Sequence, residues 1–154
     1  MYDFLLPIHS LFRWFVLSSL IYSISIAFMG YSKSWQFSKN HDSIRHWTAT
    51  IAHIQLVLGI LIYTKSLTVK SFFSGQAAND VRLESLFFGI IHLSCMLLAI
   101  VLITIGSAKA KRCPESKDKF RTMLIWFSLA LLIIFLSIPW PWSPLASRPY
   151  FRNL

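Results

Sequence analysis

The chain has little charge, few glycines and only two cysteines. Of its 154 residues, 14% are charged and 55% are hydrophobic, whereas soluble domains average about 25% charged and about 45–50% apolar residues. This composition excludes a soluble globular domain and a disordered chain. Two cysteines are too few for a disulfide framework, so we expect both to be free thiols. Five glycines leave little room for the glycine-rich loops that bind nucleotide phosphates.

The apolar residues are gathered in four long stretches, at about residues 5–30, 46–64, 84–106 and 121–139. A bilayer core about 30 Å thick needs about 20 mainly apolar residues for each helix that crosses it. We therefore predict one domain over residues 1–154, an all-α integral membrane protein that forms an antiparallel bundle of four transmembrane helices. The first stretch is too long for the apolar core of a signal peptide, so we expect it to be the first span.

The chain carries 15 Lys+Arg residues against six Asp+Glu residues. In a soluble protein this excess would suggest a nucleic-acid partner, but here the basic residues lie between the apolar stretches, as charges that orient membrane proteins do. The first and third loops and their edges hold nine of them, mostly in the loop 107–121, and the opposite face holds five. We predict that both termini are outside, that the protein lies in the inner (cytoplasmic) membrane of the cell, and that it binds no nucleic acid.

A tail rich in aromatic residues and proline, residues 139–154, follows the fourth span. Its prolines stop the helix, and we expect Trp140 and Trp142 at the outer headgroup level. The long segment between the second and third spans, residues 65–82, is expected to lie at the interface or to cover the outer mouth of the bundle.

Four ionisable side chains lie within the predicted spans. They are His9 and Arg13 in the first span, His53 in the second and His92 in the third. An ionisable residue inside a bilayer is costly, so each one is a functional hypothesis by default. The spans have no internal Asp, Glu or Lys apart from Glu84 at an outer edge, which disfavours a transporter that moves ions along a chain of carboxylates.

The depths of His53 and His92 differ by roughly 5–6 Å when each residue contributes 1.5 Å of helix rise. Bis-histidine ligation of a haem iron in a bundle needs two neutral imidazoles at similar depth on facing helices. We therefore predict a haem b with His53 and His92 as its axial, metal-binding ligands. Arg13 would bind the haem propionates, a quinone or a lipid phosphate. His9 is either an alternative ligand or part of an outer quinone or propionate site.

Each of these residues also has a purely structural explanation. A buried histidine can hydrogen-bond between helices, and Arg13 can extend to the headgroups beside Trp14. We expect His46 to be an interfacial residue and Gln55 to form an interhelical hydrogen bond.

Four short segments carry a resemblance to known proteins. They are residues 9–14 (HSLFRW), 52–59 (AHIQLVLG), 102–111 (LITIGSAKAK) and 138–142 (IPWPW). In this order they resemble a family of small four-span membrane proteins of Bacteroidota that are often labelled cytochrome b-like. The resemblance implies a four-helix membrane protein that binds haem b. The family often has an acidic residue directly before the third-span histidine, where this chain has Ile91.

The leading hypothesis is a haem b protein that passes electrons within the membrane, as part of a larger assembly with other membrane subunits rather than as a stand-alone catalyst. Bis-imidazole ligation leaves no open position on the iron, which favours electron transfer over oxygen chemistry. A second hypothesis is an accessory subunit without haem, in a respiratory, secretion or motility complex. A third is copper or small-solute handling, although the four methionines are scattered rather than clustered.

Overall fold

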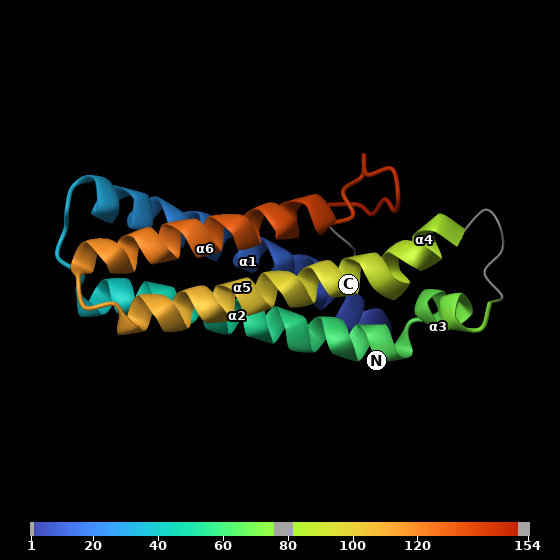
Figure 1. Ribbon diagram of the computed structural model, residues 1–154. Helices are drawn as coiled ribbons and strands as arrows, with labels where there is room; N and C mark the ends of the chain where they lie inside the picture. Colours follow the sequence, from blue (N-terminus) through green and yellow to red (C-terminus); the bar gives the residue numbers. More distant parts are fainter. Residues whose placement is uncertain (1, 76–81, 151–154) are drawn as a thin grey trace.

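The computed structural model describes residues 2–75 and 82–150, and every regular element in these residues is helical. The elements are α1 (Tyr2–Ser32), α2 (Lys39–Lys65), α3 (Leu67–Phe73), α4 (Arg82–Leu86), a π-helical turn (Phe87–Ile91), α5 (His92–Arg112) and α6 (Ser116–Ser137) (Figure 1). Four helical segments are long and apolar enough to cross a membrane, and they are Phe4–Ser32, Lys39–Lys65, Arg82–Arg112 and Ser116–Ser137. The prediction of four such helices is confirmed.

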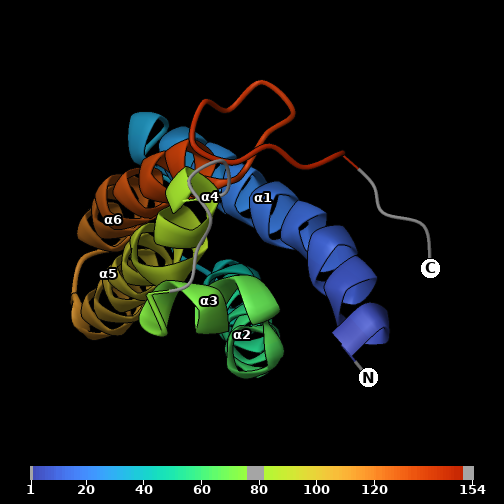
Figure 2. The same cartoon turned by 90° about the vertical axis from the view of Figure 1, so that its right-hand side faces the viewer.

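The four long segments pack as a ring in the order α1, α2, α5, α6. Helix α1 contacts α2 and α6, and α5 contacts the same two helices. Consequently α1 and α5 lie diagonally across the bundle. In the end-on view, α5 and α6 lie side by side, whereas α1 leans away from them toward its N-terminal end (Figure 2).

The core is fullest in the half of the bundle that contains the loops 33–38 and 113–115. Large side chains such as Ile103, Phe120 and Phe127 are completely buried there. Gly106 allows α5 to approach α6 closely, since a Cβ atom at this position would lie 2.3 Å from the Cβ of Trp126. Helices in membranes commonly use small residues for such approaches. We call this half the basic end, because most of the loop lysines and arginines lie there.

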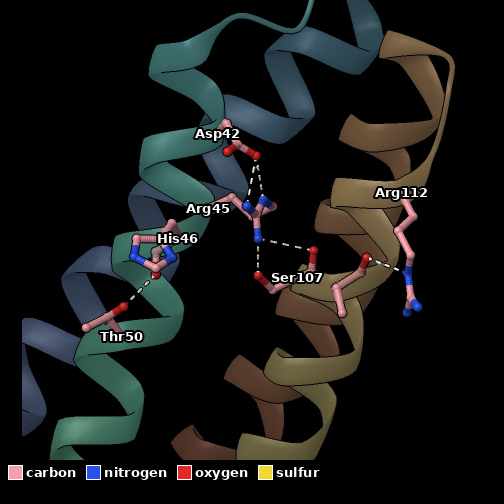
Figure 3. A network of polar contacts seen from close by, with 7 residues as sticks. Asp42, Arg45, His46, Thr50, Ser107 and Arg112 are labelled. Atoms are coloured by element: carbon pink, nitrogen blue, oxygen red, sulfur yellow. Dashed lines mark hydrogen bonds and ion pairs between the residues drawn. The ribbon is translucent and has the colours of Figure 1, made fainter.

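Arg45 is part of this core and is only 5% exposed. Its Nε donates to the Asp42 carboxylate at 2.9 Å, and its Nη1 donates to both the carbonyl and the hydroxyl of Ser107 (Figure 3). Arg45 is one of the nine basic residues at the first and third loops and their edges. It is not a solvated loop charge, because its buried and fully paired guanidinium connects α2 to α5.

The opposite half ends in α3, α4 and the segment 139–150, and we call it the α3 end. Residues 139–150 leave α6 and cross the bundle toward α1 (Figure 2). Trp140 is buried against Trp14 and Phe135, whereas Trp142 is 65% exposed. Of the two indoles expected at a headgroup level, that of Trp140 belongs to the core and that of Trp142 remains exposed.

Candidate functional site

A cavity of about 410 Å³ lies inside the α3 end of the bundle. It is walled by α1, α2, α5 and α6, and residues of α3 cover it, so part of segment 65–82 does close this end. Most of its wall is apolar. The basic and amide side chains that line it are His9, Arg13, Gln55, His92 and Arg148. The rest of segment 65–82, residues 76–81, lies outside the described residues.

His92 is held by the end of α6. Its Nδ1 lies 2.8 Å from the carbonyl oxygen of Ser137, and because a carbonyl can only accept, Nδ1 carries the proton. In a longer helix the Ser137 carbonyl would accept from the N–H of residue 141, but that residue is Pro141 and has none. The free carbonyl therefore takes the imidazole N–H. This tautomer leaves Nε2 as an unprotonated nitrogen on a side chain that lines the cavity.

The π-helical turn directly before His92 is supported from two sides. The Tyr63 hydroxyl on α2 donates to the Gly89 carbonyl at 2.7 Å. The Phe72 ring on α3 packs against Gly89, where a Cβ atom would lie 2.8 Å from the ring. Single π-helical turns are rare and occur frequently at functional sites. Here the π-helical turn sets the direction in which the His92 side chain leaves the helix.

His9 lines the same cavity from α1 and is fixed by α2. The Gln55 amide donates to the His9 carbonyl at 3.0 Å, and its nitrogen also lies 3.4 Å from the His9 Nε2. The predicted interhelical hydrogen bond of Gln55 is thus confirmed. The imidazole of His9 packs on Gly59, where an added Cβ atom would lie 3.2 Å from the Cε1 of His9. Among the described residues, the buried His9 Nδ1 and Gln55 Oε1 have no hydrogen-bond partner.

His9 and His92 lie at closely similar levels in the bundle. The Tyr63 hydroxyl on α2 contacts the Gly89 carbonyl across the helices. Gly59 lies one turn closer to the basic end than Tyr63, and His92 lies three residues closer to that end than Gly89. With 1.5 Å of rise per residue, these steps amount to about 6 Å and about 4.5 Å. The two imidazoles therefore enter one cavity at one level from diagonally opposed helices.

His53 does not share this site. Its Nδ1 lies 2.6 Å from the Ala49 carbonyl and its Nε2 lies 3.1 Å from the Thr104 hydroxyl, on an exposed face where α2 meets α5. Thr104 follows His92 by 12 residues, which is about 18 Å of helix rise. The expectation that His53 and His92 face each other is therefore corrected by the structure, because His53 pairs with a much deeper part of α5.

Arg13 lines the cavity, and it also holds the C-terminal segment. Its Nη2 donates to the carbonyls of Pro149, at 3.1 Å, and Tyr150. Arg148 pairs with Glu84 and lies over the Phe88 ring at 5.0 Å. These contacts join residues 139–150 to α1 on one side and to α4 on the other. Glu84 is thus an ion-pair partner of Arg148.

Sequence reasoning did not select Ser137, Tyr63 or Arg148 as site residues. A signal for Ser137 was present, since a proline four residues after a helical residue frees its carbonyl. The roles of Tyr63 and Arg148 depend on which helices are neighbours. His46, expected at an interface, is exposed beside Trp47.

The described residues contain no group of three or more His, Cys, Asp or Glu side chains that could hold a metal ion. Cys95 and Cys113 are free thiols, as expected. Any metal in the cavity would thus depend on the two imidazoles and on the ligand's own atoms. No family model, curated protein or solved structure matches this chain. The resemblance to a cytochrome b-like family therefore stays a prediction.

Proposed function

We propose that the cavity binds haem b, with His92 as the first axial ligand and His9 as the second. The observation that carries the proposal is the hydrogen bond from the His92 imidazole to the Ser137 carbonyl, which leaves the other ring nitrogen unprotonated. Histidines that ligate metals almost always donate their other ring N–H to a carboxylate, carbonyl or water. His92 donates Nδ1–H to the Ser137 carbonyl and keeps Nε2 for the cavity.

The remaining residues fit such a group. His9 supplies a second imidazole at the same level and has a buried nitrogen without a partner among the described residues. Apolar side chains such as Leu93, Met96 and Ile134 line the wall beside which a macrocycle would lie. Arg13 also lines the cavity, and its positive charge favours the carboxylates of haem propionates.

When bound, haem b supplies reversible one-electron oxidation and reduction. The chain's own residues then have defined tasks. Ser137 fixes the tautomer of His92, Gln55 and Gly59 fix His9, and the apolar wall excludes water. We infer an electron-transfer subunit of the inner (cytoplasmic) membrane, with both termini outside and other membrane subunits or a quinone as its electron partner. His53 has no part in this site.

The test is an absorbance spectrum of the protein purified in detergent from haem-replete cells, oxidised and then reduced with dithionite. We expect a sharp α-band in the reduced wild type. His92→Ala and His9→Ala should each lose this band, and imidazole added to either variant should restore part of it. His53→Ala is the matched control and should keep the wild-type spectrum.

Two outcomes would overturn the proposal. A colourless wild type would leave the accessory subunit without haem as the better hypothesis. A band that survives in His9→Ala and His92→Ala but disappears in His53→Ala would restore the ligand originally expected from the sequence and would exclude the cavity.

A further inference from the structure

The basic end carries lysines that are held over aromatic rings. Lys117 Nζ lies 5.3 Å from the centre of the Tyr31 ring, and Lys119 Nζ lies 5.2 Å from that of Phe37. Lys33 Nζ lies 6.0 Å from the Trp35 ring. An ammonium within about 6 Å of a ring centre is attracted by the negative face of the ring. The ring contacts therefore hold these three ammonium groups in defined positions.

The loop 33–38, which carries Lys33, is joined to the start of α6, which carries Lys117 and Lys119. The Phe37 N–H donates to the Ser116 hydroxyl at 3.0 Å, and this hydroxyl donates to the Gln36 side chain at 3.3 Å. The junction is close to α1 as well, because Lys117 reaches Tyr31. Lysines that are distant in the sequence therefore form one surface, which we call the lysine–aromatic surface. It consists of Tyr31, Lys33, Trp35, Phe37, Lys117 and Lys119.

A packed aromatic cluster supports this surface from below. The His41 ring stacks on Trp35 with 6.1 Å between centroids, and both His41 and Phe37 contact the buried Phe120 at 5.0 Å. Ser38 and His41 cap the start of α2 reciprocally, which fixes the His41 ring. The surface is thus rigid on its protein side and cationic on its outer side.

We propose that the lysine–aromatic surface binds the phosphate of an anionic phospholipid, with the acyl chains lying along the bundle. Its position favours a lipid, because the surface lies at the end of α1 and at the starts of α2 and α6, where the apolar lengths of the spans end. Aromatic rings and lysines are both enriched at this level of membrane proteins. Charge favours an anionic lipid, since further basic residues at this end, Lys39, Lys109, Lys111, Arg112 and Arg121, outnumber the acids Asp42, Glu115 and Asp118.

The test measures lipid binding to the full chain in detergent by native mass spectrometry. The probes are phosphatidylglycerol, phosphatidylcholine with the same acyl chains, and inorganic phosphate as a competitor. We expect phosphatidylglycerol to bind, phosphatidylcholine to bind at least tenfold more weakly, and excess phosphate to compete poorly. The triple variant K33Q/K117Q/K119Q should lose at least tenfold in affinity for phosphatidylglycerol, because each basic residue near an anionic surface contributes on the order of fivefold.

Two control variants separate charge at this surface from other effects. K65Q/K70Q/R82Q removes the same number of charges from exposed residues at the α3 end and should bind phosphatidylglycerol as the wild type does. K33R/K117R/K119R keeps the charge and should also retain binding. The proposal is overturned if the glutamine variant at the lysine–aromatic surface binds normally, if the α3-end control loses as much affinity, if the arginine variant loses binding, or if phosphate displaces the lipid.

Should the glutamine variant fail to fold, the wild type alone still decides. Binding of phosphatidylglycerol must then weaken steeply with added salt, because exposed charges are screened over about 10 Å at 0.1 M ionic strength. Binding that does not depend on salt would contradict the proposal.

Discussion

At the residue scale, Arg45 shows how a buried charge differs from one that orients a membrane protein. The positive-inside count treats every loop arginine as a solvated charge. Arg45 instead lies 5% exposed between Asp42 and Ser107. When Arg45 and the ion-paired Arg148 are left out, the side with the first and third loops has eight basic residues instead of nine, and the opposite side has four instead of five. The predicted orientation of the chain is unchanged, but the positive charge of Arg45 contributes to the packing of α2 against α5.

The first prediction concerns the geometry of this guanidinium. R45K should lower the free energy of unfolding by about 1–3 kcal/mol, because a lysine keeps the charge but cannot bridge Asp42 and Ser107 with one planar group. Thermal unfolding in detergent measures the change. R112K is the matched control, since Arg112 is exposed and donates only to the Ala108 carbonyl one turn before it (Figure 3). Equal melting temperatures for both variants would contradict a structural role for Arg45.

The second prediction concerns the close approach of α5 to α6. In G106A the new methyl group would meet the Cβ of Trp126 at 2.3 Å, and neither helix backbone can move freely. Overpacking of this kind costs about 1–3 kcal/mol, so the variant should melt at a lower temperature. V101I adds one carbon on the exposed face of α5 and should melt like the wild type. A stable G106A would show that the two helices can separate without cost.

At the scale of elements, the end of α6 is where the sequence determines the site most directly. Two prolines remove the N–H groups that the Phe135 and Ser137 carbonyls would otherwise accept. The Trp140 indole donates to Phe135 at 2.9 Å, and His92 donates to Ser137 at 2.8 Å. The side chains of Trp140 and His92 thus supply the hydrogen bonds that the carbonyls at the end of α6 would otherwise lack. The segment IPWPW therefore places an imidazole as well as ending a span.

The third prediction concerns the π-helical turn before His92. Y63F removes the hydroxyl that donates to Gly89 and should lower the free energy of unfolding by about 1 kcal/mol. Calorimetry or thermal unfolding in detergent measures this. Y22F is the control, because Tyr22 is 55% exposed and its hydroxyl has no bond within the described residues. If Y63F and Y22F were equally stable, the turn would not depend on α2.

The four membrane-length helices could be predicted from the sequence, because the length of an apolar stretch is a property of the stretch alone. Their bounds could not, since α2 begins at Lys39 and α5 ends at Arg112, both beyond the apolar stretches. The interhelical bond of Gln55 could also be predicted, since a polar group inside a bundle needs a partner. The placement of His9, rather than His53, in one cavity with His92 could not. It depends on the ring order of the helices, on their relative shift and on the π-helical turn, which rotates His92 relative to a regular helix. None of these three leaves a signal in hydropathy.

At the scale of the whole molecule, the two ends of the bundle differ in kind. The α3 end contains a cavity, and the segment 139–150 crosses it through Arg13 and Arg148. The basic end is filled with large side chains and carries the lysine–aromatic surface. The two ends of the bundle therefore differ in both packing and surface charge.

The fourth prediction concerns the orientation of the chain in the membrane. On a background without cysteine, C95S/C113S, single cysteines are placed at exposed residues of the two ends by E115C and S147C. If the basic end is inside, a maleimide that cannot cross membranes should label S147C in intact spheroplasts and E115C only after lysis. The charges at residues 107–121 are the physical reason, because Lys and Arg are retained on the cytoplasmic side.

E115C and S147C act as controls for each other, since the maleimide must label both after lysis. Labelling of E115C alone in intact spheroplasts would reverse the orientation and place the cavity toward the cytoplasm. Labelling of both in intact spheroplasts would contradict a bundle that spans the membrane. The expected pattern would place the cavity in the outer half of the bilayer. Under the proposed function, the electron partner of the haem would then lie in that same half.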